Sequence, residues 1–123
     1  MRESRPLSEP ILQFSLLDEI ARLAGEPQWS DGDRNSIVLA RDEQFRVLLT
    51  VMRRGAQIAD RDGTETLSLQ LLSGSVMVRR DAADAVLAPG ELVVLERGGA
   101  WSIDALEESA ALFTLGETGV AGL

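Results

Sequence analysis

The sequence predicts an all-β fold, a single barrel or sandwich of short strands preceded by one short α-helix. From residue 36 onward, apolar runs of strand length alternate with glycine-containing turn signals. The turn signals are Arg54-Gly55, Asp62-Gly63, Ser73-Gly74, Pro89-Gly90 and Gly98-Gly99. At 123 residues with 45% apolar and 4% aromatic content, the chain suits one domain whose core is mainly aliphatic.

The expected strands all lie between residues 36 and 116. They cover residues 36–39, 45–52, 67–72, 76–79, 85–87, 92–95, 101–103 and 110–115. The runs at 47–49 and 92–95 are continuously apolar, which is typical of strands covered on both faces. One face would fill the barrel, and the other would need a helix or a second subunit. We therefore expect a homodimer.

A short amphipathic helix is expected over residues 16–24. Ser15 with Asp18 three positions later forms a capping box at its start, and Gly25 stands where a helix often ends. Five apolar residues fall on one face at helical spacing: Leu16, Leu17, Ile20, Leu23 and Ala24. So short a helix is unstable alone and must dock on the strands.

These elements divide the chain into three parts. Residues 1–35 form an N-terminal extension that carries the helix, with 26–34 as a loop because of its proline, glycine and acidic residues. Residues 36–116 form the barrel, and residues 117–123 form a flexible, glycine-rich tail.

Composition excludes several kinds of chemistry. The chain has no cysteine and no histidine, which removes disulfides, the usual transition-metal ligands and the serine–histidine triad. Its formal charge of -8 argues against nucleic acid and anionic membranes as partners. No apolar stretch is long enough to span a bilayer, and none resembles a secretory signal. We expect a cytoplasmic protein.

Four glycines, Gly55, Gly74, Gly90 and Gly98, stand in order between the strand-like runs. Their spacing resembles the paired motifs of the cupin superfamily. The first motif places His-x-His and then a glutamate between two glycines, and the second is a glycine followed by Pro-x-Gly, a histidine and an asparagine. The resemblance covers residues 36–116 and is to small single-domain bacterial cupins of the RmlC-like type. It implies a cupin-type double-stranded β-helix, that is, a jelly-roll barrel with a short N-terminal α-helix.

The sequence departs from the family at every position that would bind the metal. In the motif register, Arg61 and Gly63 stand at the two histidine positions, Leu67 at the glutamate, Glu96 at the proline, Trp101 at the third histidine and Ala105 at the asparagine. The resemblance therefore implies a metal-free member with no cofactor. The glycines can be retained when the metal ligands are lost, because tight corners of the chain need positive φ, which glycine adopts without strain.

Four residues are candidates for a ligand pocket inside the barrel: Arg61, Leu67, Leu69 and Trp101. Trp101 would be a stacking wall for an organic ligand, or would simply fill the space that metal and water occupy in relatives. Arg61 would clamp an anion, or would be a solvated loop residue. Leu67 and Leu69 share one strand face by alternation and would line a dry interior, with Ser68 and Gln70 facing outward.

A slip of one residue in the first motif gives an alternative metal site. It would place Asp60 and Asp62 at the histidine positions, and with Glu65 these could bind Ca²⁺ or Mg²⁺ through oxygen. The same Asp-x-Asp-Gly sequence is also an ordinary turn in which the side chains accept from local amides.

Three functions remain open at this point. The first is non-catalytic binding of a small apolar or weakly anionic molecule in the barrel. The second is a structural or dimerisation role with the lumen packed shut. The third is a metal-independent enzyme, of isomerase or cyclase type, which would need a carboxylate with a raised pKa inside the barrel. A cavity of about 300 Å³ would favour binding over the structural role.

Overall fold

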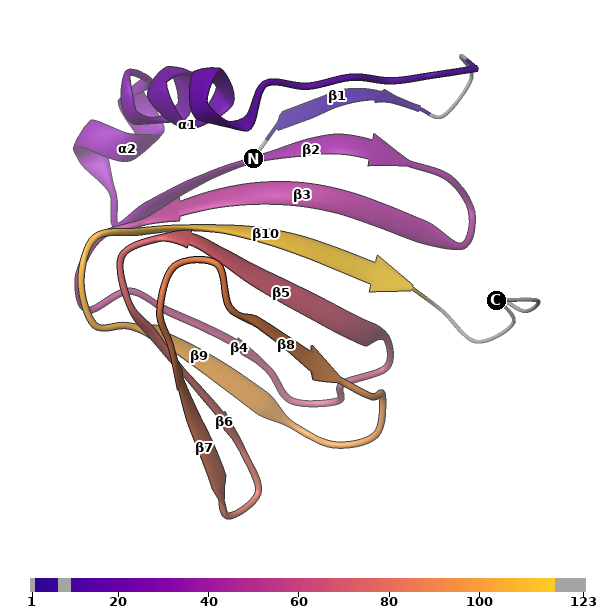
Figure 1. The fold of residues 1–123 in the computed structure, drawn as a ribbon, viewed down its shortest axis with the longest axis vertical. Helices are drawn as coiled ribbons and strands as arrows, with labels where there is room; N and C mark the ends of the chain where they lie inside the picture. The colour runs from indigo at the N-terminus through magenta and orange to yellow at the C-terminus, as the bar shows by residue number, and fades with distance from the viewer. Residues whose placement is uncertain (1, 7–9, 117–123) are drawn as a thin grey trace.

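The computed structural model describes residues 2–6 and 10–116, which form two β-sheets packed face to face with two helices outside the larger sheet (Figure 1). The larger sheet has the order β1 (Arg2–Pro6), β2 (Arg34–Arg41), β3 (Phe45–Met52), β10 (Ser109–Gly116), β5 (Thr66–Ser73) and β8 (Leu92–Leu95). The smaller sheet has the order β4 (Gln57–Asp60), β9 (Trp101–Ala105), β6 (Val76–Arg80) and β7 (Ala83–Leu87). Neighbouring strands run antiparallel except β1 and β2, which are parallel. The predicted all-β jelly roll is confirmed.

All eight predicted strands are present, and two of them, β3 and β8, have the predicted bounds. Two strands were not predicted. β1 consists mostly of charged and polar residues, and β4 has only two apolar residues, so neither gives a clear strand pattern. Both strands are defined by their pairing with a neighbouring strand, β1 with β2 and β4 with β9. The predicted tail 117–123 lies outside the described residues.

The N-terminal region contains α1 (Leu16–Ala24) and α2 (Pro27–Asp31). The prediction for α1 is confirmed, because Ser15 accepts from the Asp18 N–H at 3.4 Å. The loop expected over 26–34 was wrong in part, because α2 forms one short turn there with Pro27 at its first position. The expected face of α1 also needs correction: Leu17 is 80% exposed, whereas Leu23 is fully buried.

The main core lies between the two sheets. β5 alternates as predicted, with Leu67, Leu69 and Leu71 buried, while Gln70 on the opposite face is exposed. The smaller sheet meets them with apolar side chains from β6, β7 and β9: Val76, Val78, Leu87, Trp101, Ile103 and Ala105. These side chains interdigitate and fill the space between the two sheets on the side of the barrel formed by β5 and β6.

A second core lies between the helices and the outer face of the larger sheet. Its buried members are Leu23, Trp29, Ile37, Leu39, Leu49, Val51 and Ala110. Asn35, which is buried, donates through Nδ2 to the Leu23 carbonyl at 3.0 Å and to Glu26 Oε1 at 2.9 Å. The guanidinium of Arg53 lies 4.3 Å from the centroid of the Trp29 ring and donates to the Trp29 carbonyl. These contacts hold both helices over β2 and β3.

The turn between β5 and β6 depends on a glycine. Gly74 has φ +88°, and a Cβ there would lie 2.2 Å from Ser109 Oγ and 2.3 Å from the Glu108 carbonyl oxygen. Ser109 Oγ accepts from the Ser75 N–H at 3.0 Å. The atoms that a Cβ would meet therefore belong to the contact between the β5–β6 turn and the start of β10. Gly55 also has a positive φ, +90°, but no atom lies within 4 Å of the position that a Cβ would occupy.

This difference predicts unequal effects of two identical substitutions. Gly55→Ala adds only the strain of positive φ and should lower the free energy of unfolding by about 1 kcal/mol. Gly74→Ala adds backbone overlap as well and should lower it by about 3 kcal/mol or more. Urea unfolding followed by circular dichroism measures both values. Equal losses for the two variants would show that the close approach at Gly74 has no energetic consequence.

Candidate functional site

A cavity of about 270 Å³ lies between the two sheets, where β2, β3 and β10 face β4 and β9. In the part of the chain that the structure describes, nine residues line it: Arg34, Ser36, Arg46, Leu48, Thr50, Ile58, Trp101, Phe113 and Leu115. We call this space the barrel-mouth cavity. It lies beside the main core, because Leu48, Ile58 and Leu115 also pack against that core.

Strand alternation explains why these residues meet. On β3, Arg46, Leu48 and Thr50 are two positions apart and line the cavity, whereas Leu49 and Val51 belong to the core under the helices. The strands on either side of β3 carry this inner face across the sheet. Ser36 lies opposite Thr50 on β2, and Phe113 lies opposite Leu48 on β10.

The smaller sheet supplies the apolar wall. Trp101 begins β9 and is only 8% exposed, and Ile58 lies on the neighbouring β4. Arg80 steadies the loop before Trp101, because it donates to the carbonyl oxygens of Glu96 and, at 3.0 Å, Gly99. Together with Leu48, Phe113 and Leu115, these side chains make most of the cavity surface apolar.

The polar groups are two hydroxyls and two guanidinium groups. Ser36 Oγ and Thr50 Oγ1 are 2.8 Å apart and share a hydrogen bond. Arg46 donates from Nη1 and Nη2 to both oxygens of Glu65, at 3.0 and 2.9 Å.

Arg34 forms a second ion pair, with its chain neighbour. Its guanidinium donates from Nε and Nη2 to the two carboxylate oxygens of Asp33, at 3.0 and 3.3 Å. This hydrogen bonding to Arg34 lowers the pKa of Asp33 below its usual value. Neither Glu65 nor Asp33 lines the cavity, so the described part of its surface carries two guanidinium groups and no carboxylate.

The structure separates the four residues predicted for a pocket. Trp101 lines the barrel-mouth cavity. Leu67 and Leu69 face the interior, as alternation predicts, but are 1% and 0% exposed in the main core and do not line the cavity. Arg61 is exposed in the turn after β4 and does not line it either.

The alternative acidic metal site takes the form of an ordinary turn. Asp60 Oδ1 accepts from the N–H groups of Asp62 and Gly63, at 3.0 and 3.2 Å. Glu65 pairs with Arg46 instead of turning toward the two aspartates. Within residues 10–116, no three acidic side chains gather in a way that could bind a metal ion.

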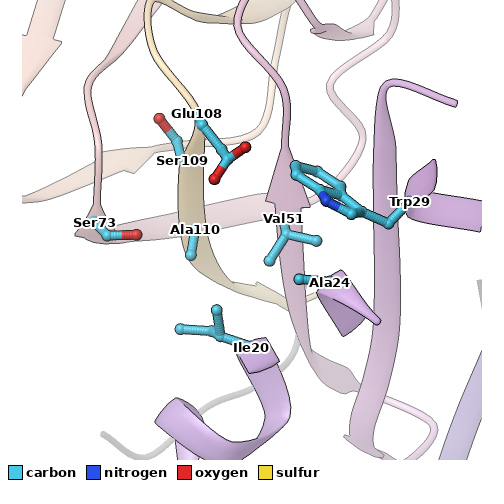
Figure 2. Close-up of a pocket in the computed structure, with 8 residues that line it drawn as sticks. All are labelled: Ile20, Ala24, Trp29, Val51, Ser73, Glu108, Ser109 and Ala110. Atoms are coloured by element: carbon cyan, nitrogen blue, oxygen red, sulfur yellow. The ribbon is translucent and has the colours of Figure 1, made fainter. Parts of the chain in front are cut away.

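A smaller cavity of about 70 Å³ lies on the opposite face of the larger sheet, under the helices (Figure 2). Its lining comes from α1, α2, β3, the end of β5, the start of β10 and the residue just before it: Ile20, Ala24, Trp29, Val51, Ser73, Glu108, Ser109 and Ala110. Figure 2 shows the Trp29 ring and the Glu108 carboxylate on either side of Val51. The space suits a few water molecules, whose share of liquid volume is about 30 Å³ each, and is too small for an organic ligand.

Comparison with solved structures identifies the fold. A protein of unknown function from Rhizobium leguminosarum bv. viciae superposes with a TM-score of 0.67 and 19% identity, over 89% of this chain and 98% of that chain. A cupin-2 domain-containing protein from Shewanella frigidimarina gives 0.65 and 14%, over 82% and 91%. KdgF from Halomonas sp. gives 0.63 and 17%, over 75% and 82%.

The chain therefore has the cupin fold, as its glycine spacing predicts. No family model and no curated protein matches the sequence. In the part of the chain that the structure describes, no helix is long and apolar enough to cross a membrane.

Proposed function

We propose that this protein binds a small organic molecule with an apolar body in the barrel-mouth cavity. The observation that carries the proposal is the cavity of about 270 Å³, walled by Trp101, Phe113 and aliphatic side chains and edged by a few polar groups. This composition is typical of small-molecule sites, which are mostly apolar with a few polar groups that fix orientation.

The size of the cavity limits the ligand. Small-molecule sites usually measure about 300–1,000 Å³ for drug-sized ligands, so a cavity just below that range suits a smaller one. Trp101 and Phe113 both line it but are only 8% and 3% exposed, so together with the aliphatic side chains they favour a ligand with a flat apolar body. A packed, purely structural barrel would leave no such space.

A metal-independent isomerase or cyclase is the alternative function, and the lining residues do not favour it. Such an enzyme needs a group that gives or takes a proton near neutral pH, for which a buried carboxylate is the main option in a chain without histidine. Among the residues that the structure describes, the cavity lining contains no aspartate or glutamate. Binding without catalysis is therefore the better account.

The proposal includes a metal-free, cytoplasmic protein. Its support is the chain itself, which has neither imidazole nor thiolate to bind iron, zinc, copper or nickel tightly. The cysteine-free, acidic composition agrees with a reducing compartment.

Ligand binding is tested with naphthalene-2-carboxamide, a flat neutral probe, by isothermal titration calorimetry on protein first analysed for metals. We expect one site per chain, and an affinity at least about ten-fold lower in Trp101→Ala, because a stacking wall is lost.

Leu48→Trp, which fills the cavity, should also abolish binding, whereas Trp29→Phe under the helices should leave it unchanged. Equal binding by the parent and Leu48→Trp would refute the site, and one bound transition metal per chain would refute the metal-free part.

We further propose that a second copy of the chain pairs with the β8 edge of the larger sheet, making a homodimer. The helices pack on β2 and β3, but the outer face near β8 leaves Leu92 60% and Val94 57% exposed, beside the exposed Gln70 of β5. β8 is the last strand of its sheet. Two β8 strands paired antiparallel about Val93 would place Leu92 of one copy opposite Val94 of the other, on the same face.

Light scattering after size exclusion tests the dimer. Leu92→Lys with Val94→Lys should convert it to a monomer, because four ammonium groups would meet across the two-fold axis. Val86→Lys is the matched control, since Val86 is 57% exposed on β7, at the edge of the other sheet. A monomeric parent, or a double variant that remains dimeric, would contradict this interface.

A further inference from the structure

We infer that the ligand of the barrel-mouth cavity is a small monocarboxylate whose carboxylate is bound at the end formed by Arg34, Ser36 and Thr50. This inference rests on the proposed function, because it names the chemistry of a ligand at that same site. Three observations support it. They are the sign of the charges on the cavity lining, the unused hydrogen-bond donors there, and the order of polar and apolar residues along β2 and β3.

The charge of the cavity is opposite to that of the protein. The chain has a formal charge of -8, yet the cavity-lining residues that the structure describes include two arginines and no acid. A carboxylate entering the cavity would therefore meet guanidinium groups, although each of them already has one carboxylate partner outside the lining. Neutral ligands alone would not require this arrangement.

The two arginines lie at opposite ends of the cavity. Arg34 pairs with Met52 at one end of the β2–β3 ladder, and Arg46 pairs with Arg41 at the other. Met52 and Arg46 are six positions apart on β3, which corresponds to about 20 Å along the strand. A single carboxylate therefore binds at one end or the other, and its apolar body extends toward the middle of the cavity.

Arg46 is already neutralised. Its two terminal nitrogens bond both oxygens of Glu65, whose side chain is only 19% exposed. A bidentate pair of this kind gives a fixed, neutral wall. A ligand carboxylate placed there would also meet the like charge of Glu65.

Arg34 is held more loosely and has free donor capacity. Its carboxylate partner, Asp33, is 56% exposed and is its immediate chain neighbour, so water screens this pair strongly. The pair uses Nε and Nη2, and among the described residues no partner is recorded for Nη1. A guanidinium has five N–H donors, so Arg34 can bond a ligand carboxylate without releasing Asp33.

The hydroxyl pair completes this end. Ser36 is the next inward-facing position after Arg34 on β2, and Thr50, which is 2% exposed, lies opposite it. The bond between the two hydroxyls uses one hydrogen, which leaves the second for a carboxylate oxygen. Leu48 and Phe113 follow immediately in the next inner row, where an aromatic or aliphatic body would lie.

The test compares two nearly isosteric probes, naphthalene-2-carboxylate and naphthalene-2-carboxamide, by isothermal titration calorimetry. The parent should bind the carboxylate at least about ten-fold more tightly, because a charge-assisted hydrogen bond distinguishes the two. Arg34→Gln should remove this preference, because it lowers carboxylate affinity much more than carboxamide affinity. Asp33→Asn should raise carboxylate affinity, because it removes the competing anion.

The control is the double variant Arg46→Gln/Glu65→Gln, which removes the other ion pair without changing net charge. It should keep the carboxylate preference. Loss of the preference in this variant but not in Arg34→Gln would overturn the inference and move the carboxylate to the opposite end. Equal parent affinities for the two probes would overturn the carboxylate requirement while leaving the proposed function standing. If neither probe binds, the proposed function fails together with the inference.

Discussion

The packing of two sheets of unequal width determines both the stability of this protein and the location of its cavity. Aliphatic side chains from β5 meet those of β6 and β9 in a closed layer in which Leu69 and Ile103 are fully buried. The larger sheet extends further, through β10 and β3 to β2, and here only β4 and β9 face it. Because four strands cannot cover the inner face of six, the space beside the core stays unfilled. The position of the cavity thus follows from topology, and the size and polarity of the lining side chains determine its volume and its chemistry.

β3 connects the two cores. Its outward residues, Leu49 and Val51, anchor the helices, and its inward residues, Arg46, Leu48 and Thr50, line the cavity. A shift of one residue in the register of β3 would exchange the two sets and place a guanidinium under the helices. The ligand site and the attachment of the helices therefore depend on the same register.

Much of the fold follows from sequence, because its signals are local. Glycine corners, strand-length apolar runs and the Ser15 cap each act within a few residues, and the inward burial of Leu67 and Leu69 follows from alternation along one strand. The site depends instead on which strands face each other. Arg34 and Arg46 lie at the ends of ordinary strands, and only the pairing of β2 with β3 and their position opposite β4 give these arginines a common cavity. Alternation along β3 predicts that Arg46, Leu48 and Thr50 lie on one face of the strand. It does not predict that this face borders a cavity. Motif spacing located Trp101 but gave no reason to consider Arg34.

The most direct test of the account is a crystal structure of the protein with naphthalene-2-carboxylate bound. The account predicts the ring between the sheets, against Trp101 and Phe113, with its carboxylate within hydrogen-bonding distance of the Arg34 guanidinium and the Ser36–Thr50 hydroxyl pair. A ring seated elsewhere, such as under the helices beside Trp29 or on the exposed face of β8, would contradict it.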